Sequence, residues 1–348
     1  MISNYQSVTD FRQEVARREL AKEDYIVSQN AILMDFNDGS LNFQEKHYPL
    51  TDYSHKQLAD RLQIPRKYYE MIDRIAGLRA FNVNQLLMHE ERKKFMLRTL
   101  DDKVRAVLSE RFKPFDNAFV LQPLFEVLEE FPHSTIKTQV LTDLKMFIQV
   151  IFPGITADVR PGDPIQCGIT IVNSETGSAA FDIKQLIWRQ ICSNGAVASS
   201  VMRRYHVGRR VGNDESDYTI FKDDTIAAEL HSFKLRIRDV LSHTLTQDSF
   251  NEVVAQYRQA ADDKFDKPKV VIENVTKRFN FTETQADKTF GNLISGADMT
   301  RYGLSNAITA MAKEVDNRDR QYEIERHGFD IINMTANEWG KMVKADEE

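Results

Sequence analysis

The sequence has little of what membrane, disulfide-rich and low-complexity proteins require. Two cysteines in 348 residues cannot form a disulfide framework, and no apolar stretch approaches the roughly 20 residues of a membrane span. Glycine and proline are scarce, at 14 and 9 residues, which argues against long disordered tracts. Because the N-terminus has no apolar signal region either, we expect a cytoplasmic protein with no membrane partner.

Catalytic and nucleotide-binding motifs are also missing. The sequence has no GK[ST] phosphate loop, no GxGxxG after a strand, no HExxH and no GxSxG. Its eight histidines show no metal-ligand spacing, and its paired carboxylates fall in expected turns or at helix ends. We therefore expect no catalytic residue, no metal and no cofactor, although a nuclease site gathered from several elements would leave no such motif.

Charge is distributed unevenly along the chain. The net charge is −6, yet residues 92–113 include eight basic and three acidic residues, and residues 183–213 include six basic and no acidic ones. The rest of the chain is therefore strongly acidic. A protein with such separation can bind an anion locally, so its overall acidity does not exclude nucleic acid as a partner.

The segment 180–210 combines this positive charge with strand patterning. Its first half alternates apolar and polar residues and breaks at Ser193-Asn194-Gly195, where glycine tolerates positive φ. Two interpretations stay open: a core sheet with a solvated cationic rim, or an anion-binding face for a nucleic-acid backbone. Trp188 and Tyr205 would then be core aromatics or stacking faces for bases. The basic residues of this segment are Lys184, Arg189, Arg203, Arg204, Arg209 and Arg210. On an extended strand Arg203 and Arg204 would point to opposite sides, so only one of them could face a groove unless the chain turns there.

The first 93 residues predict a helix, a hairpin and a pair of helices. Ser7 or Thr9 would cap the first helix, and Asn37-Asp38-Gly39 between two apolar runs is a hairpin signal. From Tyr53 to Ile75 the apolar spacing is that of a helix-turn-helix, with Gln63 where that motif usually has glycine. The pair is either packed without a DNA role or includes a recognition helix, which would expose Arg66, Lys67 and Tyr68.

Two strands are predicted around Asp101-Asp102, followed by a helix over 119–131. The strands and their exit carry Arg98, Arg105, Arg111 and Lys113. These cations are either guards of a solvated strand edge or part of the anion-binding face.

We expect an α+β fold with a central antiparallel sheet flanked by helices and a mostly helical C-terminal region. Residues 136–211 are β-rich, and the short turn-forming segment 173–177 favours antiparallel order. After Asp214 an apolar stripe with helical spacing predicts long helices, a capping box starts at Thr282, and Gly328 would end a helix. The expected divisions are 1–93, 94–213 and 214–348.

Three segments resemble, in order and spacing, the phage- and plasmid-associated family known as domain of unknown function 932. They are VRAVLSERFKPFDN, then IVNSETGSAAFDI with RQICSNGAV, then YGLSNAITAMAKEVDNRDRQYEIERHG. The most specific features are Asn173-Ser174 with Gly177, Arg189 with Cys192-Ser193-Asn194-Gly195, and Asn306-Ala307-x-Thr309. One departure is that only Tyr302-Gly303 represents the aromatic residue and short loop before the last motif. The resemblance covers roughly Gln57 to Gly328 and implies a phage or plasmid setting rather than a reaction.

The sequence therefore favours a non-catalytic protein that binds or anneals single-stranded DNA in recombination or replication. The phage annealing recombinases, which are similar in setting a sheet beside helices, suggest a homo-oligomer. We expect its contacts through the helices at 226–257 or 298–328, because their apolar stripes exceed what a small sheet needs for cover. The alternative is a structural, regulatory or anti-defence protein that binds a phage or host protein. The residues expected to bind nucleic acid are Arg98, Arg105, Arg111, Lys113, Lys184, Arg189, Asn194, Arg203, Arg204, Arg209 and Arg210.

Overall fold

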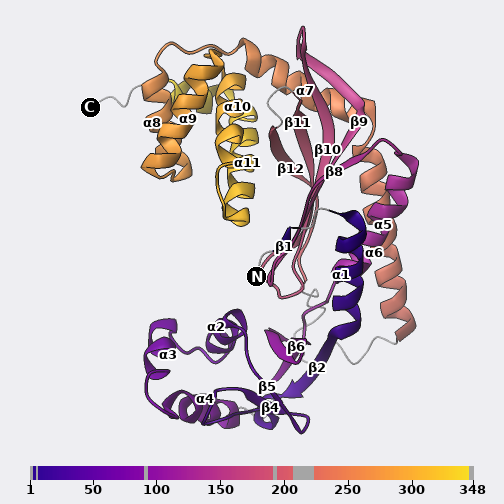
Figure 1. Ribbon diagram of the computed structural model, residues 1–348, viewed down its shortest axis with the longest axis vertical. Coiled ribbons are helices and arrows are strands. Elements are labelled where there is room, and N and C mark those ends of the chain that lie inside the picture. The colour runs from indigo at the N-terminus through magenta and orange to yellow at the C-terminus, as the bar shows by residue number, and fades with distance from the viewer. Residues whose placement is uncertain (1–2, 5–6, 90–92, 191–193, 207–222, 345–348) are drawn as a thin grey trace.

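A six-stranded antiparallel sheet forms the centre of the computed structural model, which describes residues 3–4, 7–89, 93–190, 194–206 and 223–344 (Figure 1). The strand order is β1-β8-β9-β10-β11-β12. The strands are β1 (Ser3–Asn4), β8 (Thr135–Leu141), β9 (Met146–Arg160), β10 (Asp163–Asn173), β11 (Phe181–Arg189) and β12 (Asn194–Arg204). Strands β8 to β12 are neighbours in sequence order because short connections join them, which confirms the predicted antiparallel sheet.

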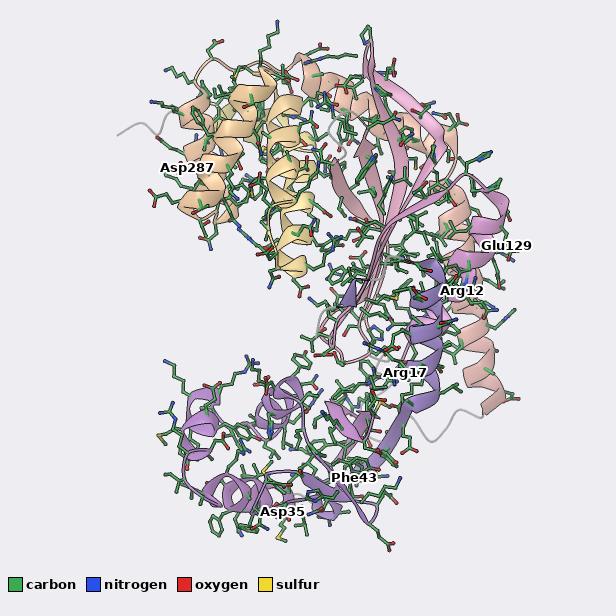
Figure 2. All side chains as sticks on the ribbon, viewed as in Figure 1. Arg12, Arg17, Asp35, Phe43, Glu129 and Asp287 are labelled. Atoms are coloured by element: carbon green, nitrogen blue, oxygen red, sulfur yellow. The ribbon has the colours of Figure 1, made fainter. Side chains whose placement is uncertain are left out.

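One face of this sheet packs on four helices, two that precede β8 in the sequence and two that follow β12. They are α1 (Val8–Ala21), α5 (Asn117–Glu130), α6 (Asp223–Thr244) and α7 (Gln247–Asp262). Figure 2 shows Arg12 on α1, where its guanidinium lies over the ring of Phe125 on α5. The apolar stripe of α6 and α7, with Phe233, Ile237 and Phe250, is fully buried in this core. The reason to expect an oligomer contact through 226–257 was an uncovered apolar stripe, and the sheet already covers that stripe.

The other face of the sheet is covered by the C-terminal helices. Helix α11 (Arg318–Ile332) lies against β12, and Tyr322 contacts Phe147 on β9. Helix α10 (Arg301–Ala312) packs beside α11 and is buried on nearly every side, which leaves it little surface for a second copy at 298–328. The remaining helices, α8 (Pro268–Phe279), α9 (Glu283–Gly296) and α12 (Ala336–Met342), gather around α10 and α11 (Figure 1).

A separate lobe contains the N-terminal hairpins and helices, at the bottom of Figure 1. Phe43 lies in its core (Figure 2). Its two small sheets have the orders β2-β6-β7 and β3-β4-β5. Its elements are β2 (Lys22–Ser28), η1 (Gln29–Ala31), β3 (Leu33–Met34), β4 (Leu41–Phe43), β5 (Lys46–Tyr48), α2 (Asp52–Arg61), α3 (Arg66–Ile72), α4 (Leu78–His89), β6 (Lys94–Leu100) and β7 (Lys103–Ser109).

The hydrophobic clusters do not follow the expected divisions of the chain. The hairpin β6–β7 contributes Phe95, Leu97 and Val107 to the cluster of the N-terminal lobe, rather than to the central sheet. Helices α6 and α7 belong to the cluster of the sheet, and a third cluster spans Phe265 to Met342. The chain is thus organised as an N-terminal lobe, a sheet layer with α1 and α5 to α7, and a C-terminal helical group.

Gly328 was predicted to end a helix, and the structure shows otherwise. It lies inside α11, which continues to Ile332, and a Cβ built on it would lie 2.3 Å from Cγ2 of Thr309 on α10. The residue is therefore a point of close helix contact, where the hydroxyl of Ser305 also donates to the Gly328 carbonyl oxygen at 2.7 Å. The predicted capping box at Thr282 is confirmed, with both of its hydrogen bonds to and from Gln285.

Two further sequence predictions can be compared with the structure. The turn at Gln63 between α2 and α3 has φ 57°, so glutamine adopts the left-handed conformation expected of the usual glycine. Cys167 is fully buried, and burial raises the pKa of its thiol to about 12, as suits a packing residue. Among the described residues, no helix has the length and apolar composition that crossing a membrane requires.

Candidate functional site

Several of the predicted nucleic-acid-binding cations lie in the interior instead. Arg98 on β6 is completely buried and forms ion pairs with Asp24 at 2.8 Å and Asp116 at 2.8 Å. Its Nη1 also donates to the carbonyl oxygen of Glu175 at 2.8 Å. All three nitrogens of this buried guanidinium donate to protein oxygens, so Arg98 does not contact a phosphate in this structure.

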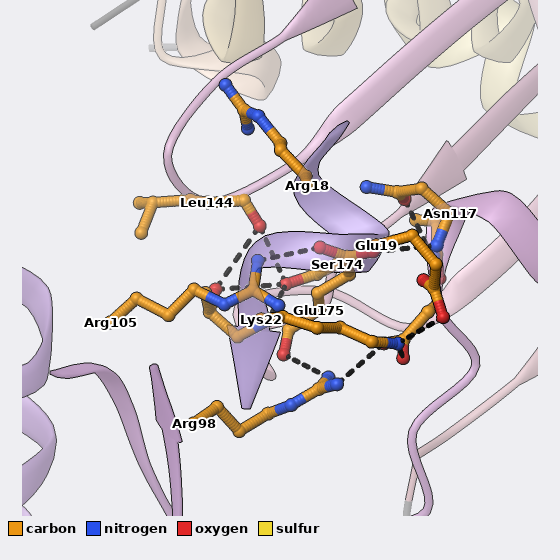
Figure 3. Close-up of polar contacts among 12 residues, drawn as sticks. Arg18, Glu19, Lys22, Arg98, Arg105, Asn117, Leu144, Ser174 and Glu175 are labelled. Carbon is orange, nitrogen blue, oxygen red and sulfur yellow. Dashed lines mark hydrogen bonds and ion pairs between the residues drawn. The ribbon is translucent and has the colours of Figure 1, made fainter. Parts of the chain in front are cut away.

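Arg105 belongs to the same buried network, which Figure 3 shows. Its Nη1 donates to Oε2 of Glu175 at 2.7 Å, and Oε1 of Glu175 accepts a bond from the backbone N–H of Asn117 at 2.8 Å. Lys22 joins through Asp116 and Glu19. Burial lowers the pKa of Lys22, but the charge and hydrogen bond of Asp116 outweigh it and leave that pKa above its ordinary value.

This network connects the N-terminal lobe to the sheet. Arg98 and Arg105 come from the lobe's hairpin, whereas Asp116 precedes α5 and Glu175 lies in the β10–β11 loop. The side chain of Asn173, at the end of β10, donates to the carbonyl oxygen of Phe115 at 2.7 Å. The prediction that Arg98 and Arg105 form part of an exposed basic face is therefore wrong for this structure, because both are buried in ion pairs that join the lobe to the sheet.

Lys184 is buried on the face of the sheet beneath α11. Its ammonium lies 3.6 Å from Oδ2 of Asp182 and 5.5 Å from the ring centre of Tyr322. Burial lowers the pKa of Lys184. Helix α11 thus stands where a phosphate would have to approach, which corrects the prediction for Lys184.

Arg189 and Asn194 meet α10 at the opposite end of the sheet. Arg189 forms a two-bond pair with Asp163 at 2.8 and 2.9 Å, and the hydroxyl of Tyr302 donates to the same carboxylate at 3.0 Å. Asn194 is buried and donates to the hydroxyl of Thr309 and to the Asn306 carbonyl oxygen. The prediction that Asn194 contacts nucleic acid is corrected by this burial.

A cavity of about 10 Å³ lies at this junction, bordered by Arg189, Asn194, Tyr257 and Thr309. That volume is about one water molecule, too small for a substrate. The features that carry the family resemblance therefore coincide with two junctions: Asn173 to Gly177 at one end of the sheet, and Arg189, Asn194 and the α10 motif at the other. Both junctions hold the fold together.

The exit of β12 is where the predicted cations stay near the surface. Arg203 is exposed, and its guanidinium lies 5.2 Å from the ring centre of Tyr205, which is 63% exposed. Arg204 points to the other side of the strand, over Phe233 at 4.3 Å. The expectation that Arg203 and Arg204 face opposite ways is thus confirmed.

Arg204 and Lys113 share one carboxylate beside this exit. Glu229 on α6 accepts from Lys113 at 2.7 Å and from Arg204 at 3.0 Å. The hydrogen bond from Lys113 and the charges of both cations outweigh burial and lower the pKa of Glu229. Lys113 and Arg204 thus lie on the other side of β12 from Arg203 and Tyr205, and Arg203 is the cation beside the exposed ring, opposite Asp182 of β11.

Three predicted nucleic-acid-binding residues remain, Arg111, Arg209 and Arg210. Arg111 is half-buried on the approach to α5. Arg209 and Arg210, together with Cys192 and Ser193 of the family-like motif, lie outside the described residues.

The helix pair of the N-terminal lobe exposes the residues expected of a recognition helix. Arg66, Lys67 and Tyr68 are all exposed at the start of α3, but Arg66 is paired with Asp60 of α2 at 2.8 Å. A cavity of about 260 Å³ between α2 and α3 has three basic and three acidic side chains on its walls, so it offers an anion no net attraction. Within the ranges that the structure describes, no group of three or more His, Cys, Asp or Glu side chains is placed to hold a metal ion.

Sequence reasoning missed the acidic partners of the predicted cations. Asp116 and Glu175 lie within the family-like segments VRAVLSERFKPFDN and IVNSETGSAAFDI, which contain both members of the Arg105–Glu175 pair but not Arg98, the partner of Asp116. Asp24, Asp163 and Glu229 carry no such signal, because each is a single carboxylate far along the chain from its cation.

The comparisons with known proteins agree with the resemblance. A family model described as "Domain of unknown function (DUF932)" matches residues 104–329. No curated protein and no solved structure matches the chain. The N-terminal lobe up to Lys103 lies outside the matched range.

Proposed function

The chain belongs to the DUF932 family, and we propose that it is a non-catalytic protein that binds single-stranded DNA through the exit of β12. The observation that carries this proposal is the exposed pair of Arg203 and Tyr205, with Arg204 and Lys113 on the other side of the same strand end. A cation attracts the phosphate backbone, and an exposed aromatic face stacks on a base of any sequence. Single-stranded DNA offers both groups together, whereas the bases of a duplex are stacked inside.

The position of β12 in the sheet also supports DNA binding at its end. β12 is the last strand of the sheet, and its residues 199–201 are exposed. An edge strand leaves backbone N–H groups without a strand partner, and these can serve as further donors to phosphate oxygens.

The biological setting completes the proposal. We infer a phage or plasmid protein that acts in the host cytoplasm, binding or annealing strands during recombination or replication as a homo-oligomer. The sequence resemblance and the positive charge at the β12 exit support this setting.

The test is binding of a labelled oligothymidine, measured by fluorescence anisotropy, with a duplex of equal length beside it. We expect the single strand to bind more tightly, and Tyr205→Ala to weaken binding by the stacking of one base, about 1–3 kcal/mol. The control is Phe36→Ala, which removes another exposed aromatic ring, between β3 and β4 of the N-terminal lobe. Equal binding of Tyr205→Ala and wild type would remove β12 as the site.

A further inference from the structure

The cavity of about 10 Å³ between α7, β12 and α10 is bordered by two buried residues whose hydrogen bonding is incomplete. Tyr257 on α7 and Asn194 at the start of β12 are each only 3% exposed. Within the ranges that the structure describes, the Tyr257 hydroxyl and Oδ1 of Asn194 have no protein partner. Since the large majority of buried polar atoms in proteins are hydrogen-bonded, two such atoms at one cavity point to a bound ligand.

The amide of Asn194 is held in one orientation by α10. Its Nδ2 donates to the carbonyl oxygen of Asn306 at 3.2 Å and to the hydroxyl oxygen of Thr309. The Thr309 hydroxyl has its own proton directed to the backbone, with the Ser305 carbonyl oxygen at 3.0 Å, so its oxygen acts as an acceptor. Both partners of the amide nitrogen are therefore acceptors, and the atom left without a partner is the amide oxygen, which needs a donor.

The hydroxyl of Tyr257 has the complementary capacity. Burial raises the pKa of Tyr257 well above its ordinary value, so the hydroxyl keeps its proton. A protonated hydroxyl donates one hydrogen bond and accepts others. The two residues thus present one donor and one acceptor to whatever lies between them.

The charged groups around the cavity are paired with one another. The guanidinium of Arg189, on the cavity wall, forms an ion pair with Asp163 at 2.8 Å. Arg160 lies 5.8 Å from the ring centre of Tyr302, another wall residue, and is paired with Asp298 at 3.0 Å. These two ion pairs carry no net charge, so they favour a neutral ligand over an ion.

One water molecule matches both the volume and the chemistry of the site. A cavity of about 10–15 Å³ holds a single water, which donates and accepts at once. A chloride ion would face the acceptor Oδ1 of Asn194, and a hard metal cation takes about six oxygen ligands. We propose that the cavity binds one ordered water, which accepts a hydrogen bond from the Tyr257 hydroxyl and donates one to Oδ1 of Asn194.

This water site gives the family-like motif residues a common role. The bound water joins α7 to the start of β12, and the amide nitrogen of Asn194 joins the same residue to α10. Asn306 and Thr309 of the last motif fix the amide, and the amide oxygen holds the water. These residues serve the water site whether or not the β12 exit binds DNA.

The first test is a crystal structure of the full chain at a resolution that shows ordered waters. We expect a density peak at hydrogen-bond distance, about 2.5–3.0 Å, from both the Tyr257 hydroxyl and Oδ1 of Asn194. Soaks in bromide and in rubidium should give no anomalous signal at this peak. An anomalous signal there, a direct bond between Tyr257 and Asn194, or a site without density would each overturn the proposal.

The second test is a double-mutant cycle, which needs no crystal. Tyr257→Phe removes the hydroxyl, Asn194→Ala removes the amide oxygen, and urea titration gives the equilibrium constant of unfolding. Because one water connects the two groups, the effect of both changes together should be smaller than the product of the single effects by at least about threefold.

The matched control for this cycle combines Tyr257→Phe with Tyr25→Phe on β2 of the N-terminal lobe, where the single effects should simply multiply. If the effects of Tyr257→Phe and Asn194→Ala multiply in the same way, no water bridges the two residues. Asn194→Ser replaces Asn194→Ala if thermal melting shows that the alanine variant is misfolded.

Discussion

The sheet region and the N-terminal lobe differ in which side chains they bury: the first buries cations, and the second exposes apolar residues. In and around the sheet, cations that stand out in the sequence turn inward, as Arg98, Lys184 and Arg189 do towards Asp24, Asp182 and Asp163. In the lobe, apolar residues such as Met71 and Phe81 point outward. The comparison teaches that a charge-rich segment can turn its cations inward, while a segment of ordinary composition can expose its apolar side chains.

Removing the buried junction between the two regions should have the largest effect. Arg98→Met keeps the volume but leaves the buried Asp116 with only part of its neutralising charge and removes the cation that pairs with the more exposed Asp24. Breaking one partner of a buried pair costs about 3–5 kcal/mol. Urea unfolding followed by circular dichroism measures this loss of the free energy of unfolding. A loss below about 1 kcal/mol would show that the cations of the junction are not structural.

The next effect depends on pH and on a histidine beside the β12 exit. Burial lowers the pKa of His206 to about 4, and the ring stacks on Phe112 with centroids 5.0 Å apart. Since the unfolded state binds a proton near pH 6.5 and the folded state only near 4, the free energy of unfolding should fall as pH decreases through that window. The full difference is about 3 kcal/mol. His206→Phe keeps the stacking and should flatten this part of the stability profile; an unchanged profile would mean that the imidazole is solvated.

A smaller effect should separate two glycines in helices. In Gly328→Ala the new methyl group meets Thr309, so we expect a loss of about 1–3 kcal/mol from overpacking between α10 and α11. In Gly291→Ala, on α9, the methyl group enters open space and the helix should gain up to about 1 kcal/mol. Thermal unfolding of the two variants should therefore shift in opposite directions. Shifts of the same sign would contradict the close approach of these helices.

The smallest effect is expected at a surface ion pair. Arg17 on α1 is bonded to Glu14 and Asp101 at 2.8 and 2.7 Å, but all three side chains are solvent-exposed to some degree. Arg17→Ala should cost less than about 1 kcal/mol, and salt should reduce the cost further. Comparing the loss of unfolding free energy in Arg17→Ala with that in Arg98→Met shows whether burial, rather than the number of ion pairs, determines the loss. Equal losses would contradict that conclusion.

Local patterns in the sequence were enough to predict most of the fold. Asp101-Asp102 adopts positive φ between β6 and β7, as a tight hairpin requires, and Ser7 caps α1. The antiparallel order of β8 to β12 followed from short connections. Gly328 was misread because glycine after a helical run fits both a helix end and a close helix contact, and only the position of Thr309 distinguishes them.

The candidate site was less predictable because burial and pairing are properties of the whole fold. Alternation along β11 shows that Lys184 and Asp182 share a side of the strand, but it does not show that α11, more than 130 residues later, covers that side. The same holds for Glu229, which neutralises part of the positive charge of Lys113 and Arg204. At the β12 exit the sequence correctly placed Arg203 and Arg204 on opposite sides.

The central claim is that the β12 exit, rather than the total of basic residues, binds single-stranded DNA. The most direct measurement is the dependence of oligothymidine affinity on salt for wild type, Arg203→Ala and Lys269→Ala, the last removing an exposed cation on α8. Each phosphate contact on a single strand contributes about 0.7 to the slope of log affinity against log salt. We predict that Arg203→Ala lowers the slope by about that amount and weakens binding, while Lys269→Ala leaves both unchanged. Identical slopes for all three proteins, with each confirmed as folded, would contradict the account.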